Sequence, residues 1–259
     1  MDRSLKNIKA FLFDLDGTLT VDGEPLSGVA TALDWLKAHG YAIRICTNST
    51  TRSRASMSRR LHEAGLPIEP NEIFSSPAAA VEYLRQQQIK SCCKLLSENV
   101  KIDFAEFADE IVDPKFIVIG DIGNAWNYEL MSQLFEWMMN GAQVVALHKG
   151  RYWLAGGKLR LDIGAFITGL EFATGKEAIL IGKPAPEFFR QALLSLKLPA
   201  SAVCMIGDDL INDVQGAQTT GIMGVLVRTG KYRQEAAALE TVRPDLTIDS
   251  VTDLPGLLE

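Results

Sequence analysis

The sequence has no excess of positive charge and no long apolar run, and each absence excludes a class of protein. Among 259 residues, Lys and Arg total 26 and Asp and Glu total 32, which gives a net charge of −6. No overall positive field therefore attracts nucleic acid or an anionic membrane surface. Asp14 and Asp16 interrupt the first apolar stretch, which is atypical of a signal peptide or a membrane span. We expect no nucleic-acid partner, no membrane partner and a cytoplasmic location.

Motifs of paired cysteines and motifs of nucleotide binding are also missing. The 4 cysteines include the adjacent pair Cys92 and Cys93 and show no CxxC spacing, so neither a disulfide framework nor a zinc site is indicated. No GxGxxG occurs, and Glu177 follows Gly175 and Lys176 where a P-loop needs Ser or Thr. The sequence therefore favours reduced thiols and gives no support to a nucleotide-binding loop.

Short apolar runs alternate with stretches of helical spacing, which predicts an α/β fold with a parallel sheet covered on both faces. The expected strands span 10–13, 42–46, 116–120, 144–147, 179–181, 203–206 and 225–227. The expected helices span 28–38, 54–64, 78–87, 128–139, 164–173 and 187–196. Residues 151–162 differ, because two alternating runs flank Gly156 and Gly157 in the pattern of an antiparallel hairpin.

Polar clusters follow four of the expected strands. They are DLDGT at 14–18, TNST at 47–50, GKP at 182–184 and GDDLIND at 207–213. In an open parallel sheet, functional groups gather beyond the carboxyl ends of the strands, near the point where strand order reverses. We therefore expect these four clusters to form one site.

The carboxylates of this site indicate a metal. Five aspartates at one end of a sheet repel one another unless a cation lies among them; they are Asp14, Asp16, Asp208, Asp209 and Asp213. Mg²⁺ binds one or two carboxylates together with a substrate phosphate. The ammonium of Lys183 and the hydroxyl of Thr47 would then hold a phosphoryl group.

Three other interpretations compete with this one. An EF-hand loop starting at Asp14 fails, because Leu19 and Pro25 stand where Gly and Glu are needed. Cys46 and Arg52 have the CxxxxxR spacing of cysteine-dependent phosphatases, but the loop between them lacks glycine, and we interpret Cys46 as a buried strand residue. A catalytically inactive homologue that binds phosphorylated ligands is the third alternative.

The four clusters resemble, in content and order, the motifs of haloacid dehalogenase superfamily phosphatases: DLDGT, TN, the lysine of GKP and GDDLINDV. The resemblance covers nearly the whole chain. It is greatest to the 4-nitrophenylphosphatase-like subfamily and, through stretches such as GAQVVALHKGRYW, to the phospholysine phosphohistidine inorganic pyrophosphate phosphatase group. It implies a Rossmann-like parallel-sheet core domain at 1–76 plus 179–259, with an inserted α/β cap domain at 77–178.

The resemblance also implies a mechanism. Asp14 would be the nucleophile that forms an aspartyl-phosphate, and Asp16 would protonate the leaving oxygen and then activate water. Mg²⁺ would be bound by the carboxylates of Asp14 and Asp208 and by the backbone carbonyl of Asp16. Asp209 and Asp213 would hold the outer shell of the metal. The expected activity is hydrolysis of small phosphorylated metabolites.

Other residues are expected to bind the substrate. By the same resemblance, Thr47, Asn48 and Lys183 would hold the phosphoryl oxygens. The cap is expected to close over the site and to select the substrate. His148 and Lys149 follow the strand at 144–147 and are our candidates for substrate contacts from the cap. The sequence does not fix the oligomeric state, and a homodimer formed through the cap is the arrangement we consider.

Overall fold

The protein forms two compact units. The computed structural model describes residues 5–155, 158–232 and 242–259. One unit, here called the core unit, comprises Met1–Thr47, Arg54–Phe74 and Lys183–Glu259, and the other, the cap unit, comprises Asn48–Ser53 and Ser75–Gly182. The domain boundaries expected from the sequence stay a prediction. Residues 179–182 lie in the cap unit because the strand there pairs with a cap strand.

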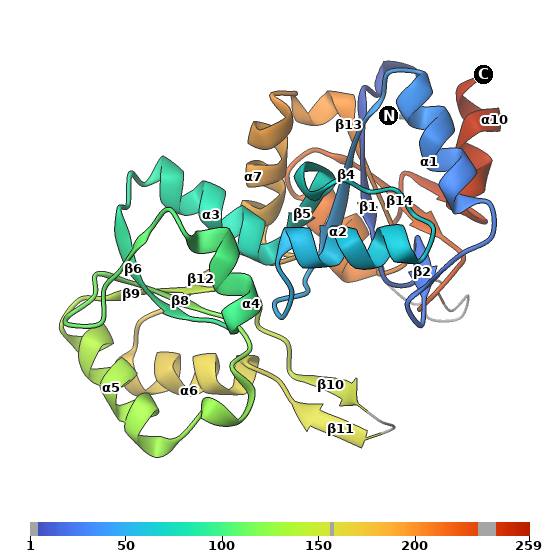
Figure 1. Ribbon diagram of the computed structural model, residues 1–259. Coiled ribbons are helices and arrows are strands. Elements are labelled where there is room, and N and C mark those ends of the chain that lie inside the picture. The colour runs from blue at the N-terminus through green and yellow to red at the C-terminus, as the bar shows by residue number, and fades with distance from the viewer. Residues whose placement is uncertain (1–4, 156–157, 233–241) are drawn as a thin grey trace. The chain divides into compact units, whose positions relative to one another are not determined.

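The core unit is built on a six-stranded sheet in the order β15-β14-β13-β1-β4-β5. Its pairings from β15 to β4 are parallel, and β1 lies between β13 and β4 at the centre (Figure 1). The predicted strands at 10–13, 42–46, 203–206 and 225–227 are confirmed, whereas the two edge strands, which are short, were missed. The bounds are β1 Ala10–Asp14, β4 Ala42–Thr47, β5 Ile73–Ser75, β13 Val203–Gly207, β14 Met223–Val227 and β15 Leu246–Ile248.

Helices and one small hairpin complete the core unit. The hairpin pairs β2 (Thr20–Val21) with β3 (Glu24–Pro25) directly after β1. In the first helix, the residues at positions 29, 32, 33 and 36 are buried, which is the spacing of one apolar helix face. The described helices are α1 Val29–Ala38, α2 Arg54–Glu63, α7 Pro186–Leu196, α8 Gly216–Gln218, α10 Leu254–Leu258, the π-helix η6 Leu210–Gln215, and the 3₁₀-helices η1 Leu5–Asn7, η2 Pro70–Glu72, η5 Ala200–Ala202 and η7 Val251–Asp253.

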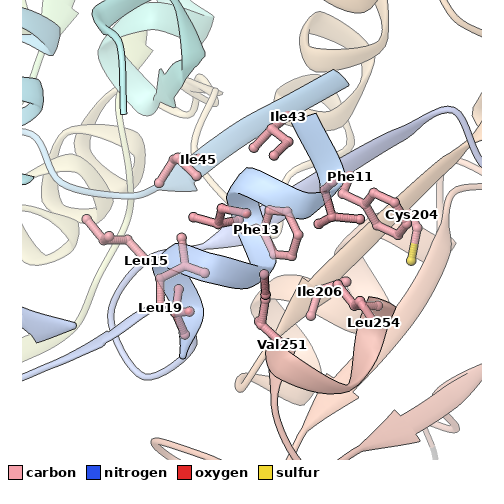
Figure 2. Packing of buried hydrophobic residues seen from close by; sticks show 14 of the residues in the cluster. Phe11, Phe13, Leu15, Leu19, Ile43, Ile45, Cys204, Ile206, Val251 and Leu254 are labelled. Atoms are coloured by element: carbon pink, nitrogen blue, oxygen red, sulfur yellow. The ribbon is translucent and has the colours of Figure 1, made fainter. Parts of the chain in front are cut away.

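The central strand is fixed by its apolar side chains. Phe11 and Phe13 are fully buried on one face of β1, because alternate residues of a strand point to the same side. Figure 2 shows Phe13 between Ile45 of β4 and Val251 near the C-terminus. The two phenyl rings also stack on each other with centroids 5.9 Å apart. This packing fixes the register of β1 and therefore the position at which Asp14 leaves the sheet.

The cap unit has its own five-stranded sheet in the order β12-β9-β8-β6-β7, with parallel pairings throughout (Figure 1). The strands are β6 Ser91–Leu95, β7 Ala108–Asp109, β8 Phe116–Ile119, β9 Gln143–Ala146 and β12 Ile179–Leu180. The described helices are α3 Ser76–Gln86, α4 Glu98–Lys101, α5 Tyr128–Met139, α6 Gly164–Thr174, and the 3₁₀-helices η3 Ile102–Phe104 and η4 Gly123–Ala125.

The expected antiparallel hairpin is present in the cap unit. Strand β10 (Tyr152–Ala155) pairs with β11 (Lys158–Leu161) in antiparallel register. The glycines at 156 and 157, on which the turn prediction depended, lie outside the described residues. No helix in the described part of the chain has the length and apolar character that a membrane crossing needs.

Candidate active site

The first carboxylates leave the core sheet at the end of β1. Asp14 is the last residue of this strand, and its side chain is 13% exposed. Gly17 has a φ of 100°, a left-handed conformation that glycine adopts without a steric penalty. The backbone N–H of Gly17 donates to Thr20 O at 2.6 Å. The chain therefore turns back sharply after Asp16.

Lys183 joins three residues of the core unit. Its ammonium donates to Asp14 Oδ1 at 2.6 Å, to Asp213 Oδ1 at 2.7 Å and to the carbonyl of Cys46 at 3.1 Å. Burial alone would lower the pKa of Lys183, but the carboxylates of Asp14 and Asp213 outweigh burial and raise it. The side chain is 3% exposed. Lys183 is therefore a buried cation at the centre of the site.

Three carboxylates come together here. Asp14, Asp208 and Asp213 each offer an oxygen within 4.8 Å of the others. Burial raises the pKa of Asp208, and burial raises the pKa of Asp213 to about 7 even though Lys183 acts in the opposite direction. Asp208 Oδ1 is buried and has no hydrogen-bond partner among the residues that the structure describes. The cluster thus has a carboxylate oxygen available to a cation. The sequence predicted Asp14 and Asp208 as metal ligands and Asp213 for the outer shell of the metal.

The remaining two aspartates interact with members of this cluster, Asp16 with Asp14 and Asp209 with Asp213. The pKa of Asp16 is raised by burial and by the charge of Asp14, so Asp16 holds a proton more readily than a solvated aspartate. Asp209 Oδ1 accepts from the backbone N–H of Ile211 at 3.1 Å and of Asn212 at 2.9 Å, and these bonds cap the π-helix η6. Their predicted roles as acid/base and outer-shell residue stay predictions.

Sequence reasoning missed one part of the site, the segment Thr229, Gly230 and Lys231 that follows β14. The hydroxyl of Thr229 donates to the carbonyl of Gly17 at 2.5 Å. The backbone N–H of Lys231 donates to Asp208 Oδ2 at 2.6 Å, and its ammonium lies 3.2 Å from Asp209 Oδ2. The signal was available, because this segment follows a predicted strand at 225–227, and the strand-end rule would have selected it.

The predicted hydroxyl-rich cluster is divided between the units. Thr47 is the last residue of β4 in the core unit and is buried. Asn48 belongs to the cap unit, where its Oδ1 accepts from the hydroxyl of Ser76 at 3.0 Å. Thr47 therefore lies one residue after Cys46, whose backbone carbonyl accepts from the Lys183 ammonium. The predicted contacts of Thr47 and Asn48 with phosphate stay predictions.

The two cap candidates have partners within the cap unit. Lys149 forms an ion pair with Glu171 of α6. His148 Nδ1 accepts from the backbone N–H of Gly150 at 3.2 Å and lies 3.7 Å from Asp162 Oδ2. Burial lowers the pKa of His148, against the nearby carboxylates. The predicted contacts of these residues with substrate stay predictions.

The cysteine alternative finds little support. Cys46 is fully buried in β4, and burial raises the pKa of its thiol to about 12. A reactive cysteine needs a thiolate and partial exposure. Arg52 is exposed and belongs to the cap unit. The interpretation of Cys46 as a buried strand residue is therefore confirmed.

We expect Cys46→Ala to retain phosphatase activity. The substitution removes a buried sulfur and leaves a small cavity, which costs about 1–2 kcal/mol of stability, but the Cys46 carbonyl that contacts Lys183 remains. The measurement is kcat on an aryl phosphate at a temperature well below the melting transition, with Cys204→Ala, also fully buried, as the control. Loss of turnover in Cys46→Ala alone would revive the thiol mechanism.

Two family models match the chain. The haloacid dehalogenase-like hydrolase model matches residues 11–109, and the HAD-hydrolase-like model matches residues 180–254. Haloacid dehalogenase-like hydrolase domain-containing protein 2 of Mus musculus is 36% identical over 237 residues, which cover 92% of this chain and 90% of that protein. Phospholysine phosphohistidine inorganic pyrophosphate phosphatase of Rattus norvegicus is 33% identical over 260 residues, 98% of this chain and 95% of that protein.

Solved structures agree with these sequence matches. The p-nitrophenyl phosphatase of Archaeoglobus fulgidus has a TM-score of 0.87 and 26% identity, with 96% of this chain and 98% of that chain covered. The 4-nitrophenylphosphatase of Thermotoga maritima shares the fold, with a TM-score of 0.88 at 24% identity over 98% of this chain and 99% of that chain. The chain therefore belongs to the haloacid dehalogenase-like hydrolase family, as one of its phosphatases.

Proposed function

We propose that the protein is a Mg²⁺-dependent phosphatase that hydrolyses small phosphorylated metabolites through an aspartyl-phosphate on Asp14, with Asp16 as general acid and base. The observation that carries this proposal is the contact of Asp14 with Lys183 at 2.6 Å within a group of three carboxylates. An anionic nucleophile can approach a phosphate only where positive charge offsets their repulsion. Lys183 provides such charge beside Asp14.

The residues of the cluster fit a hard divalent cation. Its donors are carboxylate oxygens, which Mg²⁺ prefers. One of them, Asp208 Oδ1, is buried and has no hydrogen-bond partner in the described part of the chain. A buried carboxylate oxygen without a donor or a cation is unfavourable by roughly 1–3 kcal/mol or more. Asp14 and Asp208 would hold the ion. When bound, Mg²⁺ supplies the positive charge that neutralises phosphate oxygens during transfer.

The chain's own residues account for both halves of the reaction. The Asp14 carboxylate forms a bond to phosphorus while the bond to the leaving oxygen breaks, and Asp16 gives its proton to that oxygen. In the second half, Asp16 takes a proton from water, the water oxygen bonds to phosphorus, and the Asp14–phosphorus bond breaks. The raised pKa of Asp16 supports its role as general acid and base, because this group must hold a proton first and accept one later.

The substrate class is proposed from the relatives. Their names specify phospholysine, phosphohistidine, pyrophosphate and 4-nitrophenyl phosphate, which include P–O and P–N bonds. We expect hydrolysis of phosphate monoesters, with pyrophosphate or phosphoramidates as further substrates. The cap candidates His148 and Lys149 would contribute to this choice.

A panel assay tests the proposed function. We expect the purified protein to hydrolyse an aryl phosphate in Mg²⁺ and to lose at least about 100-fold in kcat/KM after EDTA treatment, because EDTA removes the cation that offsets the charge on the phosphate. The panel adds pyrophosphate, a phosphoramidate and a sugar phosphate, each with and without Mg²⁺. Restoration by added Mg²⁺ is the control for irreversible damage. Turnover that is equal in Mg²⁺ and in EDTA would contradict the metal-dependent mechanism.

A further inference from the structure

One oxygen of Asp208 is enclosed by backbone from two distant parts of the chain. A β-carbon at Gly17 or at Gly230 would overlap Asp208 Oδ2. Both glycines have positive φ, 100° at Gly17 and 58° at Gly230. The same oxygen accepts the backbone N–H of Lys231 at 2.6 Å. Asp208 Oδ2 is therefore fixed, while Asp208 Oδ1 has no hydrogen-bond partner within residues 5–155, 158–232 and 242–259.

The two enclosing segments are also joined to each other. Thr229 Oγ1 donates to Gly17 O at 2.5 Å, and a β-carbon at Gly230 would lie 2.5 Å from the Cα of Gly17. The segment after β14 thus contacts the turn after β1 directly. Asp208 follows β13, the strand between β1 and β14. The two segments that contact each other therefore follow the strands on either side of the strand that carries Asp208.

We propose that Thr229, Gly230 and Lys231 form a positioning segment that orients Asp208 for metal binding and sets the affinity of the site for Mg²⁺. The segment holds Oδ2 through a backbone N–H and leaves Oδ1 available to the ion. This inference rests on the proposed function, since it takes the three-carboxylate cluster as the Mg²⁺ site. None of the three residues needs to touch the substrate.

The side chain of Lys231 opposes Mg²⁺ binding, whereas the backbone of the segment favours it. Its ammonium pairs with Asp209 Oδ2 at 3.2 Å and is 68% exposed. The ammonium also attracts the carboxylates of Asp208 and Asp14. A positive charge close to metal-binding carboxylates competes with a cation. Lys231 therefore weakens Mg²⁺ binding through its charge, while its N–H orients Asp208.

The test measures Mg²⁺ binding to the metal-free protein without substrate, by calorimetry and by the rise in Tm on addition of MgCl₂. Thr229→Val removes the hydrogen bond to Gly17 and is expected to weaken Mg²⁺ binding about five-fold. Thr229→Ser keeps the hydroxyl and is expected to bind Mg²⁺ as the wild type does. The control is Thr220→Val, because the Thr220 hydroxyl also donates to a backbone carbonyl, that of Ala217 at 2.8 Å.

Two further variants separate position from charge. Gly230→Ala is expected to weaken Mg²⁺ binding by at least about ten-fold, because its β-carbon displaces Asp208; Gly65→Ala, with a φ of 87° and open space around it, is the control for backbone strain. Lys231→Met is expected to tighten Mg²⁺ binding about three-fold, the size of an exposed charge interaction, with Lys9→Met at an exposed position as control.

The outcomes distinguish this inference from the proposed function. Weaker binding in Thr229→Val and Gly230→Ala together with tighter binding in Lys231→Met supports the positioning segment. A purely structural role would lower the Tm measured in EDTA and leave the Mg²⁺ dissociation constant at the wild-type value, which overturns the inference. If the wild-type protein binds no Mg²⁺ and hydrolyses phosphate esters equally in EDTA, the proposed function fails as well.

Discussion

Asp14→Asn is expected to lower kcat on every phosphate ester by about 10⁴-fold or more, because an amide cannot form the aspartyl-phosphate. The fold is expected to persist. Asparagine is close to aspartate in shape, its carbonyl can still accept from Lys183, and Asp14 is the end residue of a strand fixed by Phe11 and Phe13. The measurement combines steady-state kinetics in Mg²⁺ with Tm in the same buffer.

Two controls make this result specific. Asp34→Asn, on the exposed side of α1, is expected to leave kcat within about two-fold of the wild type, as for most surface substitutions. Acid quenching during turnover, followed by mass spectrometry, is expected to show a phosphoryl group on the peptide that contains Asp14. Turnover by Asp14→Asn above one-hundredth of the wild-type rate would exclude Asp14 as the nucleophile.

The sequence was sufficient for the central part of the fold because short apolar runs bounded by polar clusters are visible without tertiary information. Phe11 and Phe13 mark a buried strand, and Asp14 marks its end. Short elements were missed for the same reason. The edge strands β5 and β15 have three residues each, too few to show a period, and they form only because a neighbouring strand offers hydrogen bonds.

The candidate site was predictable where a motif lies on contiguous residues and less so where its contacts are tertiary. Asp14, Lys183, Asp208 and Asp213 follow from strand ends, and they do lie together. The expected place of Asp213 in the outer shell of the metal stays a prediction. Its carboxylate shares Lys183 with Asp14 because η6 returns it to the end of β13. The backbone contact of Lys231 with Asp208 carries no side-chain pattern, so no motif indicates it, and only the position of this segment after the predicted strand at 225–227 could have selected it.

Lys183→Met is expected to lower the stability of the metal-free protein by about 3–5 kcal/mol, since removal of one partner from a buried ion pair leaves its charge uncompensated. For a chain of this size the loss corresponds to roughly 10 °C in Tm, measured in EDTA. Asp213 is 1% exposed along its side chain and would lose its cation. Folding already raises the pKa of Asp213 to about 7. A carboxyl whose pKa is higher in the folded than in the unfolded state lowers the stability of the protein as pH rises. The loss is therefore expected to be larger at pH 8 than at pH 5.5.

Lys94→Met is the matched control, because Lys94 is also buried along its side chain, 7% exposed, but its partner Asp109 is 73% exposed. Water can solvate Asp109 after the substitution, so the expected loss is about 1–2 kcal/mol. Adding Asp213→Asn to Lys183→Met removes the uncompensated charge and is expected to recover a large part of the lost stability. A Tm of Lys183→Met within 2 °C (about 1 kcal/mol or less) of the wild type would show that the three carboxylates do not depend on this lysine. The same variant, assayed in Mg²⁺, is expected to lose phosphatase activity, because the Lys183 ammonium contacts both Asp14 and Asp213.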